Sequence, residues 1–135
     1  MYQTDNLSHA DALKIIAAIQ AELDETKRGA AVAVADAHGE LIAFLRTDGC
    51  KLPSITIAIN KAFTASRERV ESKQVGRASR AEQFPMTNFG DLRYTAWGGG
   101  VPIQVNDKVV GAVAVSGLSE DEDMELARMG AALIS

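Results

Sequence analysis

The chain has 135 residues, 47% of them hydrophobic and 24% charged, and its net charge is −4. These values predict one globular domain over residues 1–135 and exclude a disordered chain. No basic run is present that could bind nucleic acid, and no apolar run approaches the roughly 20 residues that cross a bilayer. The single cysteine excludes an internal disulfide and a CxxC metal or haem motif. Because the amino terminus lacks the pattern of a secretory signal, we expect a cytoplasmic protein that binds neither nucleic acid nor membranes.

The first predicted element is a helix that begins after Ser8. Ser8 and Asp11 have the spacing of a capping box, and Lys27-Arg28-Gly29 has the basic turn and glycine that end a helix. Between them, apolar residues recur at helical spacing: Ala12, Ile15, Ile16, Ile19 and Leu23.

A hairpin follows the first helix. Residues 31–35 are small and continuously apolar, which is typical of a central strand covered on both faces. Residues 36–39 form a turn, and residues 40–46 form the return strand. Alternation along that strand places Leu41, Ala43 and Leu45 on one face and Ile42, Phe44 and Arg46 on the other.

A second helix is predicted after Pro53 and Ser54. Its apolar face consists of Ile55, Ala58, Ile59, Ala62 and Phe63. Its other side is polar and carries Asn60, Lys61, Thr64 and Arg67. Residues 72–97 have weak periodicity and several breakers, so we expect mainly loop there, with short helical turns.

The last part of the chain contains a second hairpin and a last helix. Residues 101–105 and 108–116 flank Asn106-Asp107, a pair that tolerates the positive φ of a tight turn. Ser119 and the four acids after it are suited to a helix start. The order helix, hairpin, helix, loop, hairpin, helix predicts an α+β sandwich with a central antiparallel sheet.

Three consecutive glycines, Gly98, Gly99 and Gly100, precede the second hairpin and mark the most informative place in the chain. Glycine permits backbone angles and close approaches that other residues do not. The segment is therefore either a bared backbone rim that could receive a ligand or a sharp chain reversal into the strand.

Arg46, Asp48 and Lys61 are the candidate polar residues of a site. If they meet near the three glycines, they form a polar pocket able to hold a carboxylate or carbonyl oxygen. The alternative is a structural ion pair between Asp48 and a cation. No Ser-His-Asp order, HExxH helix or GxxxxGK sequence is present.

Other candidates have weaker signals. His9, in the first turn of the first helix, could bind a metal or a haem iron, because an exposed imidazole remains a ligand. His38 lies in a hairpin turn and Cys50 in a loop, where surface roles are usual. Three residues before the glycines could wall an apolar pocket or fill the core: Met86, Tyr94 and Trp97.

Three blocks of the chain resemble the GlcG/HbpS family. They are Val32 to Phe44 with Arg46 to Gly49, Ser54 to Ala62, and Gly98 to Ile103 with Val109 to Gly117 and Asp121 to Asp123. The resemblance implies a profilin-like α/β/α sandwich and self-assembly. The family includes haem-binding, redox-linked proteins and the carboxy-terminal domain of PduO-type corrinoid adenosyltransferases. His38 departs from the family pattern, which often has glycine there.

We therefore expect a homo-oligomeric protein that binds a small molecule, with haem or a related tetrapyrrole as the first candidate. Arg46, Lys61 and the amides of the three glycines are the candidate anchors, and His9 is the candidate iron ligand. One alternative is a small enzyme acting on a hydroxy- or oxo-acid by proton transfer, with Lys61 or Asp48 as base or acid. Another is an accessory subunit of a metabolic enzyme.

Overall fold

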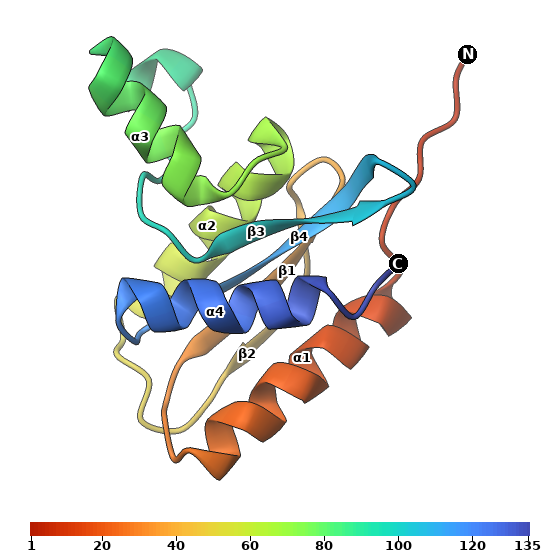
Figure 1. Cartoon of the computed structure of the whole chain (residues 1–135), viewed down its shortest axis with the longest axis vertical. Coiled ribbons are helices and arrows are strands. Elements are labelled where there is room, and N and C mark those ends of the chain that lie inside the picture. Colours follow the sequence, from red (N-terminus) through yellow and green to blue (C-terminus); the bar gives the residue numbers. More distant parts are fainter.

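The computed structural model describes all residues, 1–135, as a four-stranded antiparallel sheet between two layers of helices (Figure 1). The helices are α1 (His9–Glu25), α2 (Ser54–Glu68), α3 (Ser72–Glu82) and α4 (Glu120–Ala131), with a short 3-10 helix, η1 (Met86–Phe89). The strands are β1 (Ala31–Asp36), β2 (Leu41–Arg46), β3 (Gly100–Val105) and β4 (Lys108–Ser116). The order in the sheet is β2-β1-β4-β3. The predicted α+β fold with a central antiparallel sheet is confirmed.

Strand β1 is central and buried on both faces, as its sequence predicts. Val32 and Val34 face the larger core under α1 and α4, whereas Ala31, Ala33 and Ala35 face α2. Small side chains on the second face let α2 pack close to the sheet. This close approach brings the backbone of α2 next to the strands that carry the site.

Strand β2 departs from the predicted alternation. Its pairing with β1 shifts between Val34 and Ala35, as at a β-bulge. The extra residue turns Ile42 to the same core as Ala43 and Leu45, and only Phe44 packs on the α2 side. The prediction that Ile42 shares a face with Phe44 is wrong, because strict alternation assumes an unbroken register.

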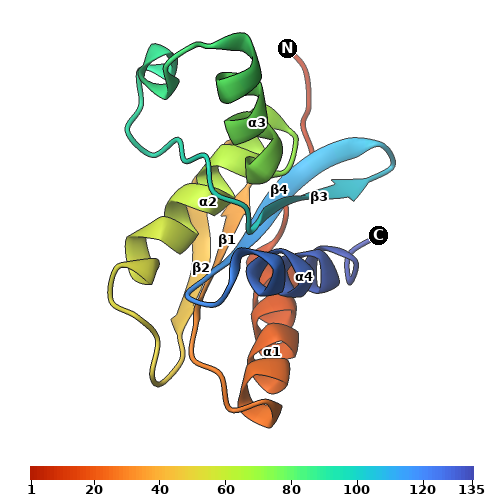
Figure 2. The same cartoon turned by 60° about the vertical axis from the view of Figure 1, so that its left-hand side comes forward.

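Helix α3 corrects the prediction that residues 72–97 are mainly loop. It projects from the body of the molecule together with η1 (Figure 2). Its start is fixed by Ser72, whose buried hydroxyl donates to the carbonyl of Trp97 at 2.7 Å. Tertiary contacts of this kind stabilise a helix without leaving a periodic apolar pattern.

The helix and turn signals elsewhere agree with the structure. Ser8 accepts the amide of Asp11 at 3.1 Å, although the reciprocal bond of a capping box forms only in α4, between Ser119 and Glu122. The β3–β4 turn has positive φ at both central residues, 51° at Asn106 and 64° at Asp107. None of the helices has both the length and the apolar character needed to span a membrane.

Candidate functional site

The three glycines form a corner that the protein itself fills. All three are buried. A Cβ atom on Gly100 would lie 2.3 Å from the backbone oxygen of Lys61, and one on Gly99 would lie 2.8 Å from the Lys61 Nζ. Glycine is therefore required here because α2 passes directly against the start of β3.

The expected bared rim is not observed at two of the three amides. The Gly98 N–H donates to Glu120 Oε2 at 3.0 Å, and the Gly100 N–H donates to Ser72 Oγ at 2.9 Å. Buried amides need such partners, and α3 and α4 provide them. The corner thus serves first to join these helices to the sheet.

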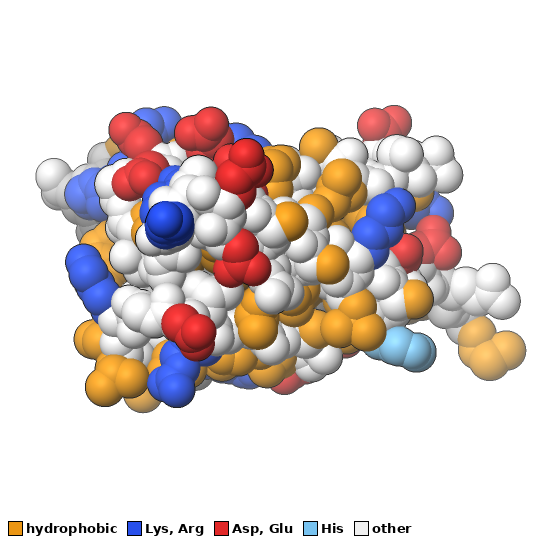
Figure 3. Space-filling model, turned by 90° about the horizontal axis from the view of Figure 1, so that it is seen from below, with side chains coloured by type: hydrophobic (Ala, Val, Ile, Leu, Met, Phe, Trp, Pro, Cys, Tyr) orange, Lys and Arg blue, Asp and Glu red, His pale blue; other side chains and the backbone are white.

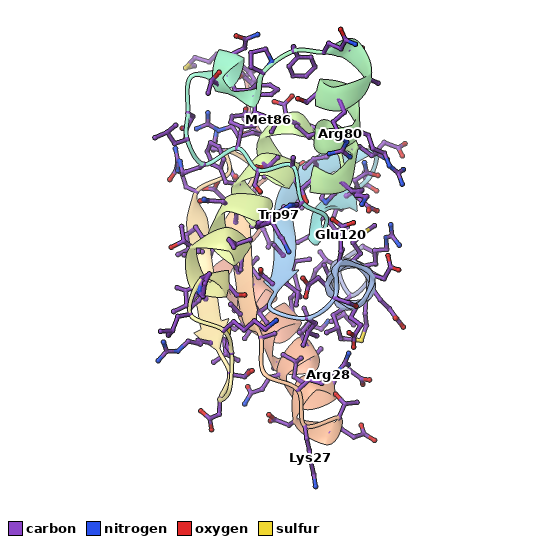
Figure 4. The ribbon with its side chains drawn as sticks, turned by 90° about the vertical axis from the view of Figure 1, so that its left-hand side faces the viewer. Lys27, Arg28, Arg80, Met86, Trp97 and Glu120 are labelled. Carbon is purple, nitrogen blue, oxygen red and sulfur yellow. The ribbon has the colours of Figure 1, made fainter.

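A cavity of about 440 Å³ lies beside the corner, between the start of α2 and the β4–α4 connection. Ile57, Trp97 and Leu118 form its apolar wall. Four charged side chains also line it: Lys51, Lys61, Glu120 and Asp123. Figure 4 shows Trp97 and Glu120 where the chain from α3 meets α4. A cavity that combines an apolar wall with few charged groups is typical of a small-molecule site.

Lys61 and Asp123 form a buried ion pair at this cavity. Lys61 Nζ donates to Asp123 Oδ2 at 3.2 Å and to the carbonyl of Val115 at 3.0 Å. The second Asp123 oxygen accepts the Leu118 amide at 3.1 Å. Both residues are only 3% exposed, so Lys61, which helical spacing places on the polar side of α2, is buried.

Burial sets the protonation of this pair. Removal from water lowers the pKa of Lys61 and raises the pKa of Asp123, because each charged form loses hydration. The mutual attraction of the two charges opposes both changes. The pKa values of Lys61 and Asp123 are therefore closer together than in water, which favours transfer of a proton between the two side chains.

Glu120 connects α3 and α4 at the rim of the cavity. It forms an ion pair with Lys73 of α3 and accepts the Gly98 amide. These bonds to the carboxylate hold the pKa of Glu120 below its ordinary value.

The structure does not bring all the predicted polar residues together. Arg46 and Asp48 are exposed and neither lines the cavity. Asp48 forms no ion pair, so the structural alternative for this residue is not observed either. Arg46 instead lies near Cys50, where its positive charge opposes the burial that raises the pKa of the thiol.

The remaining candidates lie apart from the cavity. His9 and His38 are exposed, and neither lines it. No cluster of three or more His, Cys, Asp or Glu side chains could hold a metal ion. Of the aromatic candidates, Tyr94 is half-buried and stacks on Phe89 with ring centroids 4.1 Å apart, outside both core clusters, whereas Trp97 is 60% exposed at the cavity.

Sequence reasoning missed Asp123, which it treated as one of four acids at a helix start. A usable signal was present in the spacing. Leu126 and Ala127 follow Asp123 by three and four residues, which puts the carboxylate on the apolar face of α4. An acid on such a face needs a buried partner, and Lys61 supplies it.

Comparisons with known proteins agree with this fold. Residues 7–132 match the family model described as "Haem degrading protein HbpS-like". The chain is 35% identical over 116 residues to Protein GlcG of Escherichia coli, covering 82% of this chain and 81% of that protein. It is 31% identical over 127 residues to an uncharacterized 15.0 kDa protein in the dhaT-dhaS intergenic region of Citrobacter freundii, covering 93% and 89% respectively.

Solved structures share the whole architecture. The protein ORFY of Klebsiella pneumoniae superposes with a TM-score of 0.89 at 26% identity, over 98% of this chain and 92% of that one. A double mutant of Streptomyces reticuli HbpS gives a TM-score of 0.89 at 26% identity, over 100% and 91%. A complex named PduOC:Heme has a TM-score of 0.87 over 96% of each chain, and its 22% identity shows the fold alone.

Proposed function

The chain belongs to the HbpS-like family, and we propose that it binds a small molecule in the cavity beside the glycine corner. The proposed ligand is planar and carries carboxylates, with haem or a related tetrapyrrole as the first candidate. The family description and the name of one solved relative, which is a haem complex, support this class. The observation that carries the proposal is the cavity itself, which combines an apolar wall with Lys51, a positively charged side chain that forms no ion pair.

The residues of the cavity fit the ring and the carboxylates of such a ligand. The exposed Trp97 ring can stack on a planar molecule, with Ile57 and Leu118 completing the wall. Lys51 is exposed at the cavity and takes part in no ion pair of the chain, so it is available to a carboxylate.

The same residues do not fit the iron of haem. The cavity contains none of the side chains that usually ligate haem iron, namely His, Cys, Met and Tyr. His9, the proposed iron ligand, is exposed at the start of α1 and does not line the cavity. Binding through the cavity therefore uses the ring and its carboxylates and does not depend on the metal.

Titration with haemin and with metal-free protoporphyrin IX tests the proposal. The two ligands share a ring and carboxylates, so we expect saturable binding of both with similar midpoints, followed by absorbance and by quenching of the single tryptophan, Trp97. Lys51→Glu should weaken both about three- to tenfold, the range for loss or reversal of an exposed charge contact. Lys108→Glu, a 70% exposed lysine away from the cavity, is the matched control.

The outcomes separate the two candidate anchors. Binding of haemin alone, abolished by His9→Ala, would overturn the cavity proposal and assign the ligand to His9. Absence of saturable binding for both compounds would exclude the tetrapyrrole class.

We also propose that copies of the chain assemble through the free edge of β2. Strand β2 lies at one edge of the sheet, so one row of its backbone groups is unpaired. Its side chains are mostly apolar, and Leu41 is 46% exposed. Several patches of hydrophobic side chains also lie among polar ones on one face of the molecule, and they give a second copy further apolar surface to contact (Figure 3).

A further inference from the structure

We propose that the Lys61 amine forms a covalent imine with small oxo-acids or aldehydes that enter the cavity. The inference rests on the proposed function in one respect, because it needs the cavity to admit ligands. It adds a reaction and a substrate class. In an oxo-acid, the carboxylate would pair with Lys51 while the carbonyl carbon faces Lys61.

The position of Nζ favours it as a nucleophile. The Lys61 side chain lines the cavity, and Nζ donates only to Val115 and Asp123. An ammonium has three hydrogens, so one of them has no acceptor in the protein. The two existing bonds fix Nζ in place, which removes the rotational freedom that slows the reaction of an exposed lysine.

Asp123 is placed to accept the proton that Lys61 must lose before it can react. Its Oδ2 lies 3.2 Å from Nζ, and both groups are removed from water. Burial lowers the pKa of Lys61, which favours the neutral, nucleophilic amine. The nearby Glu120 works in the opposite direction, but its charge is already compensated by Lys73.

The reaction balances without an oxidant or reductant. Asp123 takes a proton from the Lys61 ammonium, and the amine nitrogen attacks the carbonyl carbon. The carbonyl oxygen takes the proton from Asp123, which then removes one from the nitrogen. When the carbinolamine loses its hydroxyl, Asp123 protonates it to water and the C=N bond forms. The products are a protonated imine, the Asp123 carboxylate and one water.

Reductive trapping tests the inference on the intact protein. The protein is incubated at pH 7 with glyoxylate and sodium cyanoborohydride, and the modified lysines are located by peptide mass spectrometry. Two hydrogen bonds hold the Lys61 Nζ in place at the cavity, and burial lowers its pKa, which favours the free amine. We therefore expect Lys61 to be modified faster than the exposed Lys51 of the same cavity.

Two variants define the chemistry. Lys61→Arg keeps the positive charge beside Asp123 but cannot form an imine, so modification at this position should be lost. Asp123→Asn removes the proton acceptor and should slow trapping about tenfold, the lower part of the range for general acid–base contributions. If either variant fails to fold, the comparison of Lys61 with Lys51 in the unmodified chain still decides. Modification of Lys61 no faster than Lys51 overturns the inference.

A competition distinguishes this inference from the proposed function. Protoporphyrin IX should protect Lys61 from trapping and leave Lys108 unprotected. Retained protoporphyrin binding without selective trapping at Lys61 would refute the imine alone. Selective trapping without protoporphyrin binding would refute the tetrapyrrole class and support the imine.

Discussion

The contact between Gly100 and the backbone of Lys61 determines how the site is built. A Cβ on residue 100 would lie 2.3 Å from the Lys61 oxygen and 2.8 Å from its carbonyl carbon, both of which are backbone atoms of α2. We expect Gly100→Ala to lower the free energy of unfolding by about 1–3 kcal/mol or more, because α2 must move to relieve the overlap. Urea denaturation followed by circular dichroism measures the change.

Gly98→Ala is the matched control at the same corner. Its Cβ would meet Met124 Sδ at 2.7 Å and Glu120 Cγ at 3.1 Å, which belong to side chains that can move. The expected loss is less than half of that for Gly100→Ala. Equal losses would show that close packing against the α2 backbone does not set the requirement for glycine.

Lys61 shows where sequence reasoning fails for single residues. Helical spacing predicted Lys61 on a polar side of α2, yet its partners Val115 and Asp123 come from 54 and 62 residues further along the chain. Local spacing has no information about partners at that distance. The sequence indicated that the three glycines permit a close approach, but that α2 is the element that approaches Gly99 and Gly100 follows only from the tertiary structure.

Elements were predictable where their determinants are local. The β3–β4 turn needs positive φ at two adjacent residues, and Asn106-Asp107 supplies residues that tolerate it. Helix α3 lacks such a signal, since only Ser72, Val75 and Gly76 are buried in it. Two ion pairs link it to α4, Lys73 with Glu120 and Glu71 with Arg128.

The link between α3 and α4 should weaken in acid. The pKa of Glu120 in the folded chain lies below its ordinary value of 4.5, chiefly because of Lys73 and the Gly98 amide. A lowered pKa means that the stabilisation is complete above about pH 4.5 and is lost as the pH falls through the folded value. We expect the fluorescence of Trp97, next to Gly98, to change over this acidic range.

Substitution of Glu120 checks the assignment. Glu120→Gln removes the charge at every pH, so Trp97 should already emit at neutral pH as it does in acid, with the acid step reduced. Glu82→Gln, on the exposed end of α3 and outside every ion pair, should leave the step unchanged. An undiminished acid step in Glu120→Gln would assign the change to another carboxylate.

At the scale of the whole molecule, the fold explains why a site forms at this place. The cavity lies where the start of α2, the β4–α4 connection and the glycine corner meet, three segments far apart in the sequence. The order of elements and the family resemblance predicted the layers that bring them together. The cavity depends in addition on Trp97, which the sequence offered as a possible pocket wall, and on Leu118 and Asp123, whose place at the cavity follows from packing.

The two edges of the sheet differ, and this difference predicts how the molecule assembles. Strand β3 contains Pro102, a residue that interrupts edge pairing, whereas β2 has neither proline nor lysine. We expect a mass above the 14.4 kDa of one chain in light scattering after gel filtration.

Leu41→Lys places a charge at the β2 edge and should shift the protein toward the monomer. Leu13→Lys, on α1 at a residue 57% exposed, should not. Dissociation by Leu13→Lys alone would move the interface to α1, and a monomer at all concentrations would exclude assembly through β2.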